Sequence, residues 1–297
     1  MSAASESLTR RSIAVWSARA AFVLALAVAV VAALGAAVPP ASAPARDVVE
    51  PGRFVWRDLM TKDLDVAKQF YGELFGWRFE NARRGDRPYV IARRDSGPVA
   101  GLVDVSAMPE AGAQWLSFMA VEDVDKSVAF VRAENGTVLV EPRELPMARA
   151  AVITDPQGAP LGLAQMRRGV PDPEQPTPHH FFWQEYLAGD ADQALTFYKR
   201  LAGYDSVILE SRLNVDYHVL RSTRGRAGLF RLPPNVVGVQ PNWLPYVLVS
   251  DPAALAARVP SLGGRVVVAA APERRNGSLA VIADPGGAVL ALQKFPF

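Results

Sequence analysis

Two carboxylate residues follow two tryptophans at the same spacing in distant parts of the sequence. Trp56 and Asp58 form one pair, and Trp183 and Glu185 form the other. Residues two apart on a strand project from the same face, so each carboxyl group would share a face with an indole ring. A carboxyl group that faces an apolar cavity has a raised pKa and can serve as a general base. The same group can instead form a structural ion pair with an arginine, and both interpretations stay open at this stage.

Four further aromatic residues occupy matching positions in the two halves of the chain. Tyr89 matches Tyr217, and Trp115 matches Trp243. Such residues either pack in a core or line a ligand pocket, which is typically apolar with a few polar groups. The candidate catalytic residues are therefore Asp58 and Glu185, and the candidate ligand contacts are Trp56, Tyr89, Trp115, Trp183, Tyr217 and Trp243.

These residues belong to a pattern that occurs twice. Residues 56–77 recur without a gap as residues 183–204. Each copy predicts a strand, an aspartate that caps a helix, and a helix with apolar residues at three- and four-residue spacing. Gly76 ends the first helix and Gly203 ends the second, since glycine tolerates the left-handed conformation found there.

Three strand-like segments follow each helix, so the repeated unit is βαβββ. A second round begins at Trp115, with a helix near residues 125–135 that Gly136 is expected to end. Trp243 opens the corresponding unit of the second half. The sequence thus predicts four units in two α+β domains, at residues 50–166 and 179–297, joined by a proline-rich acidic linker at residues 167–178.

The first 48 residues have the composition of a signal peptide or an N-terminal membrane anchor. Three arginines precede an uninterrupted apolar run at residues 20–38. As a helix this run would reach roughly 28 Å, close to the thickness of a bilayer core, so its length fits both cleavage and retention. Residues 9–13 also resemble a loose twin-arginine signal. Either way, the charge pattern predicts that the folded domains lie outside the cytoplasm.

Composition narrows the partners and the chemistry. Half of the 297 residues are hydrophobic, which suits globular domains with real cores, and the formal net charge is only +2. Basic residues are scattered, so nucleic acid is not an expected partner. The chain has no cysteine, which excludes disulfides, thiolate catalysis and cysteine-ligated metals.

A capped helix ending in Phe-Tyr-x-x-Leu-x-Gly, three strands and a closing Asp-Pro-x-Gly turn resemble the vicinal oxygen chelate superfamily of glyoxalases, bleomycin resistance proteins and extradiol dioxygenases. The resemblance extends from Phe54 to Phe297. It implies two tandem glyoxalase-like domains, in which paired βαβββ units form an open, cup-shaped sheet. It also implies a small-molecule ligand and pairing of the two domains within the chain.

Metal enzymes of this family bind a divalent ion through a histidine on the first strand of a unit and a glutamate on the last. Aligned on the family motifs, the first position holds Trp56 and Trp183, and the second holds Gly162 and Ala291. None of these side chains is a metal ligand. We therefore expect no metal at these positions and no other cofactor.

Two functions from different classes remain, beside a structural or interaction role in which aromatic side chains close the cups. The first is an exported or membrane-anchored binding protein for a small apolar molecule, without the usual metal. The alternative is an enzyme of the same family, a lyase, isomerase or dioxygenase-like protein, that uses Asp58 or Glu185 as a base or an unorthodox metal site.

Overall fold

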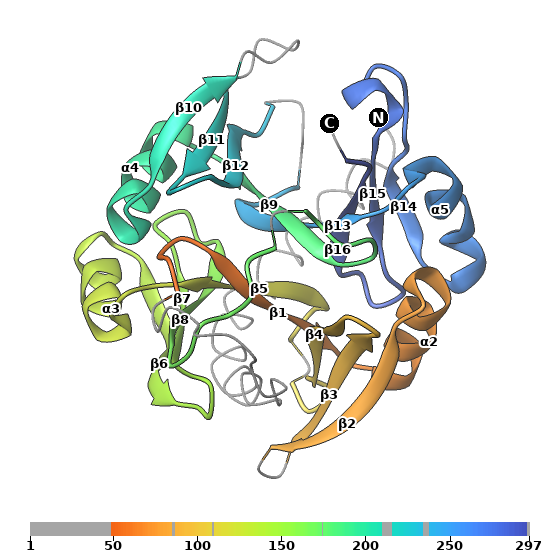
Figure 1. Cartoon of the computed structure of the whole chain (residues 1–297), viewed down its shortest axis with the longest axis horizontal. Coiled ribbons are helices and arrows are strands. Elements are labelled where there is room, and N and C mark those ends of the chain that lie inside the picture. The colour runs from red at the N-terminus through yellow and green to blue at the C-terminus, as the bar shows by residue number, and fades with distance from the viewer. Residues whose placement is uncertain are drawn as a thin grey trace, which may run out of the picture.

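The computed structural model describes residues 49–84, 87–108, 110–173, 175–209, 216–233 and 238–295. Its strands form two open, mixed sheets of eight strands, one from each half of the chain (Figure 1). The first sheet has the order β2-β3-β4-β1-β5-β8-β7-β6 and the second the order β10-β11-β12-β9-β13-β16-β15-β14. The strands of the first sheet are β1 (Phe54–Thr61), β2 (Arg78–Arg84), β3 (Arg87–Arg94), β4 (Gly97–Asp104), β5 (Gln114–Ala120), β6 (Thr137–Glu144), β7 (Ala148–Thr154) and β8 (Pro160–Met166). Those of the second are β9 (Phe181–Ala188), β10 (Asp205–Leu209), β11 (Tyr217–Arg221), β12 (Gly225–Arg231), β13 (Asn242–Leu248), β14 (Arg265–Val268), β15 (Leu279–Ala283) and β16 (Val289–Gln293).

The first strands of two βαβββ units lie side by side in the middle of each sheet. β1 pairs antiparallel with β5, and β9 pairs antiparallel with β13. The last strand of each unit then pairs parallel with the first strand of its own unit, as β4 does with β1 and β8 with β5. This arrangement confirms the predicted fold of paired units in two open α+β sheets.

Each unit carries one α-helix with an aspartate cap. The helices are α2 (Leu64–Phe75), α3 (Val124–Ala133), α4 (Ala191–Ala202) and α5 (Pro252–Arg258), with 3-10 turns η2 (Pro260–Leu262) and η3 (Arg275–Gly277) in the last unit. The Asp63 carboxylate accepts from the backbone N–H groups of Asp65 and Val66, both at 3.0 Å. Gly76 and Gly203 end α2 and α4 in the left-handed region, as predicted.

The end of α3 differs from the prediction. Asn135 takes the left-handed conformation, with φ of 65°, and Gly136 does not. Gly136 is needed for a close approach instead, because a Cβ there would lie 2.6 Å from Val131 Cγ1 and 2.7 Å from the Thr154 carbonyl. Asparagine tolerates the left-handed region better than most residues, so the helix can end one position earlier.

The largest buried clusters combine residues of both domains. One joins α2 and the first unit to α5, β15 and β16 of the last unit. The other joins α3 and the second unit to α4 and the third unit. Figure 1 shows the same pairing, with α2 beside α5 and α3 beside α4. The opposite face of each sheet, called here the inner face, carries a separate cluster from a single domain.

A buried arginine lies where the two sheets meet. The Arg57 guanidinium lies over the rings of Phe54 and Phe181, at 5.8 and 5.4 Å from their centroids. Burial, with Arg53 nearby, lowers the pKa of Arg57 to about 9. Its counterpart in the second domain is Gln184. When the Gln184 amide is oriented so that both its oxygen and its nitrogen form hydrogen bonds, the oxygen accepts from Arg57 Nε at 3.3 Å.

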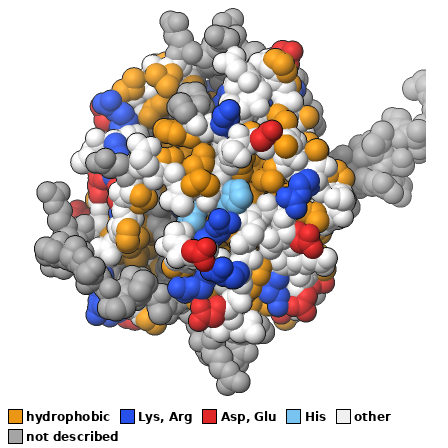
Figure 2. Space-filling view, turned by 45° about the vertical axis from the view of Figure 1, so that its right-hand side comes forward, with side chains coloured by type: hydrophobic (Ala, Val, Ile, Leu, Met, Phe, Trp, Pro, Cys, Tyr) orange, Lys and Arg blue, Asp and Glu red, His pale blue; other side chains and the backbone are white. Residues whose placement is uncertain are grey.

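On the molecular face shown in Figure 2, Lys and Arg side chains are interspersed with Asp and Glu side chains. That face therefore presents no broad field of one sign. Among the helices described from residue 49 onward, none is long and apolar enough to cross a membrane. The apolar run at residues 20–38 lies outside the described residues.

Candidate ligand sites on the inner faces of the sheets

A β-bulge near the start of β1 determines which residues of that strand point toward the first inner face. Phe54 pairs with Met119, whereas Trp56 pairs with Phe118, so Val55 is the extra residue. Val55 and Trp56 both contact the inner-face cluster, while Phe54 packs between the domains. The second sheet has the same irregularity at Phe182. Bulges of this kind redirect side chains next to functional sites.

The first inner face brings together three residues expected to form a site. Trp56 Nε1 donates to Asp58 Oδ1 at 2.8 Å, and the Tyr89 hydroxyl donates to the same oxygen at 3.0 Å. Trp56 Nε1 also lies 3.2 Å from the Tyr89 hydroxyl. Asp58 is completely buried, with Met60, Leu116 and Phe118 among the residues of the same cluster. The result is a carboxylate held by two aromatic donors in a largely apolar wall.

Glycine makes this cluster possible. A Cβ on Gly101 would lie 1.9 Å from the Tyr89 hydroxyl oxygen and 2.2 Å from Asp58 Oδ1. In the second domain, a Cβ on Gly228 would lie 2.0 Å from the Tyr217 hydroxyl oxygen. Both glycines stand in the sequence Ala-Gly-Leu, at residues 100–102 and 227–229. Glycine within a strand permits such a close approach.

The second inner face contains an ion pair between Glu185 and Arg275. The Tyr217 hydroxyl donates to Glu185 Oε1 at 2.7 Å, and Trp183 Nε1 donates to the Tyr217 hydroxyl at 3.1 Å. Tyr246 and Arg275 also donate to the Glu185 carboxylate. Burial, together with the Glu185 carboxylate beside it, raises the pKa of Tyr246 well above its usual value. Glu185 thus forms an ion pair with an arginine, which was the alternative to a role as a general base.

Arg275 is a site residue that the sequence did not reveal. It begins the turn η3, where Arg275 and Asn276 both have positive φ, at 48° and 54°. The guanidinium lies over the Tyr217 and Tyr246 rings, at 5.6 and 5.7 Å from their centroids. The Asn-Gly pair at residues 276–277 signals a turn, but nothing local shows that the turn reaches Glu185.

Trp115 and Trp243 do not line the inner faces, which corrects the expectation for both. Trp115 pairs with Leu59 in the interdomain core, and its indole nitrogen donates to the Tyr71 hydroxyl at 3.1 Å. Trp243 donates to the Tyr198 hydroxyl at 2.9 Å. Strand residues alternate between faces, so the inward positions fall one residue later. Those positions hold Leu116, Phe118, Leu244 and Tyr246.

The sequence and the fold both match known proteins. Residues 52–163 match the family model of the glyoxalase/bleomycin resistance protein/dioxygenase superfamily. CFP32 of Mycobacterium tuberculosis, named as a glyoxylase, is 32% identical over 256 residues, which cover 84% of this chain and 98% of the relative. The chain belongs to this superfamily.

Another relative matches a smaller part of the sequence, and solved structures match this chain in fold alone. DauV of a Streptomyces species, named as an anthracycline biosynthesis protein, is 30% identical over 122 residues, or 41% of this chain and 44% of the relative. The crystal structure of an Mn(II)-bound glyoxalase from Novosphingobium aromaticivorans superposes with a TM-score of 0.57 at 15% identity, over 82% of both chains.

The residues that the sequence alignment places at the superfamily's metal positions lie in one row of each sheet. Trp56, Phe118 and Gly162 form one row across neighbouring strands. A Cβ on Gly162 would lie 2.2 Å from the Phe118 ring, so the ring occupies the space that a glutamate side chain would need. The corresponding row of the second domain is Trp183, Tyr246 and Ala291. Across the described part of the chain, no group of three or more His, Asp or Glu side chains is placed to hold a metal ion.

Proposed function

We propose that this chain is a small-molecule-binding protein of the superfamily that works without the family's metal ion, and that its ligand lies on the inner face of the first domain. The Asp58 cluster carries the proposal, because it places a carboxyl acceptor beside a cluster of buried apolar residues. Partly exposed apolar residues border that wall, namely Val55, Trp56, Met108, Leu145 and Met166. Methionine adapts well to ligands of different shape.

The chemistry of this face selects a class of ligand. The Asp58 carboxyl group accepts hydrogen bonds, while the indole of Trp56 offers a face that attracts cations. The best match is a small, mostly apolar molecule that carries a hydrogen-bond donor or a positive charge.

We infer that the second domain has a structural role and does not bind a ligand at Glu185. Its carboxylate, Glu185, is held by two tyrosine hydroxyls and by Arg275. A ligand there would have to displace a buried ion pair, which is costly because it leaves a charge without its partner. We infer that Trp183 and Tyr217 pack this cluster and that the two domains stay paired in the working protein.

Metal independence is inferred from the side chains that fill the ligand positions. The close approach of the Phe118 ring to Gly162, with Trp56 in the same row, supports this inference. Metal analysis of the dialysed protein should find no stoichiometric divalent ion. One tightly bound Fe, Zn, Ni or Mn per chain would contradict this inference.

An enzyme that uses Asp58 as a general base is the second candidate. The contact between the Tyr89 hydroxyl and Asp58 favours it, because the pair could pass a proton. The glyoxylase name of CFP32 also points to catalysis. A bound molecule that is released chemically unchanged supports binding, and turnover that Asp58→Asn abolishes supports the enzyme.

Tryptophan fluorescence of the full-length chain tests the binding proposal, with 2-phenylethylamine as the probe. Asp58→Asn should weaken binding about tenfold or more, since a hydrogen bond to a charged group contributes about 1.5–3 kcal/mol. Glu185→Gln is the matched control and should leave the probe's affinity unchanged. Equal affinities for the wild type and Asp58→Asn would remove the polar anchor of the proposed site.

A location outside the cytoplasm is part of the proposal. It is supported by the arginine-flanked apolar run at residues 20–38, which acts either as a cleaved signal peptide or as a membrane anchor.

A further inference from the structure

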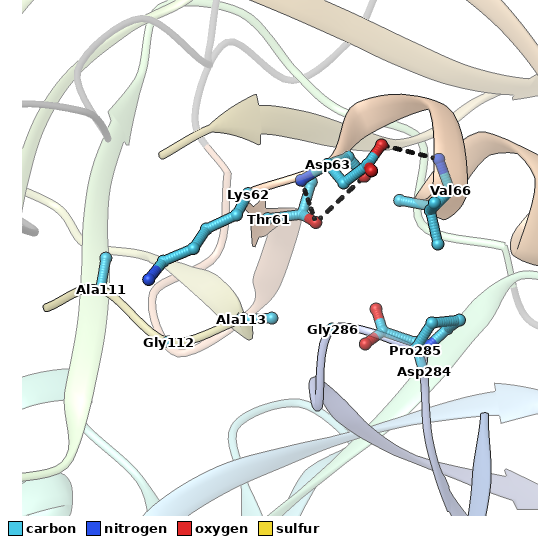
Figure 3. Close-up of a pocket in the computed structure, with 11 residues that line it drawn as sticks. Thr61, Lys62, Asp63, Val66, Ala111, Gly112, Ala113, Asp284, Pro285 and Gly286 are labelled. Atoms are coloured by element: carbon cyan, nitrogen blue, oxygen red, sulfur yellow. Dashed lines mark hydrogen bonds between the residues drawn. The ribbon is translucent and has the colours of Figure 1, made fainter. Parts of the chain in front are cut away.

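A cavity of about 340 Å³ is lined by residues of both domains. It is bordered by the end of β1, the start of α2, the loop at residues 111–113 and the turn at residues 284–286. Figure 3 shows the Lys62 side chain extending toward Ala111, and the turn from Asp284 to Gly286 facing Asp63 and Val66. Apart from Thr61, Lys62, Asp63 and Asp284, the lining side chains are apolar or absent.

The internal repeat places an equivalent junction on the other side of the molecule, and there a glutamine side chain fills the space. Gln157 Oε1 accepts from the backbone N–H groups of Gly189 and Asp190, at 2.8 and 2.9 Å. Gln157 Nε2 donates to the Asp190 carbonyl at 2.7 Å. A single carboxamide therefore makes three short hydrogen bonds to the backbone at the start of α4.

The two junctions share two hydrogen bonds of the turn aspartate. Asp155 accepts from the Ala159 N–H at 2.9 Å and from the Tyr198 hydroxyl at 2.8 Å. Asp284 accepts from the Ala288 N–H at 2.8 Å and from the Tyr71 hydroxyl at 3.0 Å. The third residue of the Asp-Pro-x-Gly turn differs, because it is Gln157 in one and Gly286 in the other. Asp155 also accepts from the Tyr186 hydroxyl, whereas the matching position of the first half is Leu59.

The backbone that Gln157 contacts has its counterpart in the cavity wall. Lys62 and Asp63 correspond to Gly189 and Asp190 in the repeat. The Thr61 hydroxyl interacts with the Asp63 N–H and carbonyl, but both distances are 3.3 Å, longer than the bonds to Gln157. A hydroxyl can rotate away from such weak bonds when a better partner arrives.

We propose that this cavity binds a primary carboxamide on a small, otherwise apolar molecule. Its oxygen would accept from the Lys62 and Asp63 backbone, and its NH₂ group would donate to the Asp63 carbonyl, as Gln157 does at the other junction. The apolar part of the ligand would contact Val66, Ala113 and Pro285. The volume exceeds that of a glutamine side chain, so a larger molecule fits.

Propionamide, which has the atoms of the glutamine side chain, is the probe for this site. Ligand-observed NMR and calorimetry on the full-length chain should detect one site per chain, with a Kd in the millimolar range as expected for so few atoms. Propionate should bind at least tenfold more weakly, because it lacks the amide N–H groups that would donate to the Asp63 carbonyl. Absence of binding, or equal binding of propionate, would overturn the proposal.

Two variants locate the binding. Gly286→Gln should fill the cavity with its own carboxamide and reduce propionamide binding at least tenfold, while Gln157→Gly should open the other junction and raise the stoichiometry from one to two. A Cβ on Gly286 would lie 2.9 Å from Ala113 Cβ, so that variant needs a small shift to fold. If Gly286→Gln does not fold, the Gln157→Gly variant decides alone, because that substitution only removes atoms. An unchanged stoichiometry in Gln157→Gly would contradict the proposal.

Asp58→Asn should leave propionamide binding unchanged, which separates this site from the proposed inner-face site.

Discussion

Single residues decide what the inner face of the first domain can bind. Asp58 meets Trp56 and Tyr89 only because residue 101 has no side chain. The tyrosine hydroxyl occupies the volume of a missing Cβ, so the site depends on a residue that has no side chain.

Gly101→Ala should therefore disrupt the cluster. Its methyl group would lie within 2.2 Å of both the Tyr89 hydroxyl and Asp58, and relieving such overpacking typically costs about 1–3 kcal/mol. Urea denaturation should show this loss in the free energy of unfolding. Gly112→Ala is a suitable control, because a Cβ there meets nothing within 4 Å. Equal stabilities of the two variants would show that Tyr89 can move away freely.

Period-two spacing within a strand was enough to place Trp56 and Asp58 on one face. The same rule misplaced Trp115, because the sequence does not show which residue of β5 begins the inward set. Arg275 could not be predicted at all, since its contact with Glu185 joins residues far apart in the chain. Local patterns thus gave the strands and caps, whereas the partner of a buried charge depends on tertiary packing.

At the scale of elements, the closing Asp-Pro-x-Gly turns connect the two domains. Asp284 accepts from Tyr71 on α2, whose hydroxyl also accepts from Trp115. Asp155 accepts from Tyr198 on α4, whose hydroxyl accepts from Trp243. In each case the aspartate of one domain completes a hydrogen-bonded chain in the other. The family motif therefore serves as an interdomain connection here.

These aspartates should leave a signature in the pH dependence of stability. Burial raises the pKa of Asp155 above its ordinary value of 3.8, so the folded state holds this proton to higher pH than the unfolded chain does. The group therefore favours folding at pH values below its unfolded pKa, and that contribution is lost as pH rises through the folded-state pKa.

Asp155→Asn removes the titration and keeps an oxygen for the turn. Relative to the wild type, this variant should gain stability as pH rises from about 4 to about 7. The measurement is the difference in the free energy of unfolding between the two proteins across that range. Asp284→Asn should behave in the same way, because burial also raises the pKa of Asp284. A difference that grows in the opposite direction would show that Asp155 stabilises the fold as a carboxylate.

At the scale of the molecule, the domains share their cores. Each interdomain cluster takes one unit from each half of the chain, and large residues such as Phe70, Tyr71, Phe197 and Tyr198 lie in these shared clusters. The linker adds ion pairs, since Asp172 contacts Arg53, Arg224 and Arg226.

Neither half should fold stably alone. Residues 49–166 and 179–297, expressed separately, would each expose the apolar surface that the other now covers. We expect aggregation or loss of near-UV circular dichroism for each half, and recovery of a folded one-to-one complex on co-expression. A monomeric half with a cooperative thermal transition would show that its own inner core is sufficient.

The predicted location can be tested with a reporter. Alkaline phosphatase fused after Pro51 should be active in a bacterial host, because the arginines ahead of the apolar run orient the following chain outward. A reporter that works only in the cytoplasm, fused at the same residue, is the matched control. Activity of that reporter alone would contradict export.

Arg57 and Gln184 occupy equivalent places in the two halves, yet only one of them is charged. If the halves were separate, identical chains in a two-fold symmetric dimer, both places would hold the same residue. Two arginines would then face each other in a buried interface, where like charges repel with little screening by water. Because the two halves are joined in a single chain, the residue at each of these two places can differ from the other. The pairing of one cation with one neutral amide is therefore an arrangement that a homodimer of either half could not reproduce.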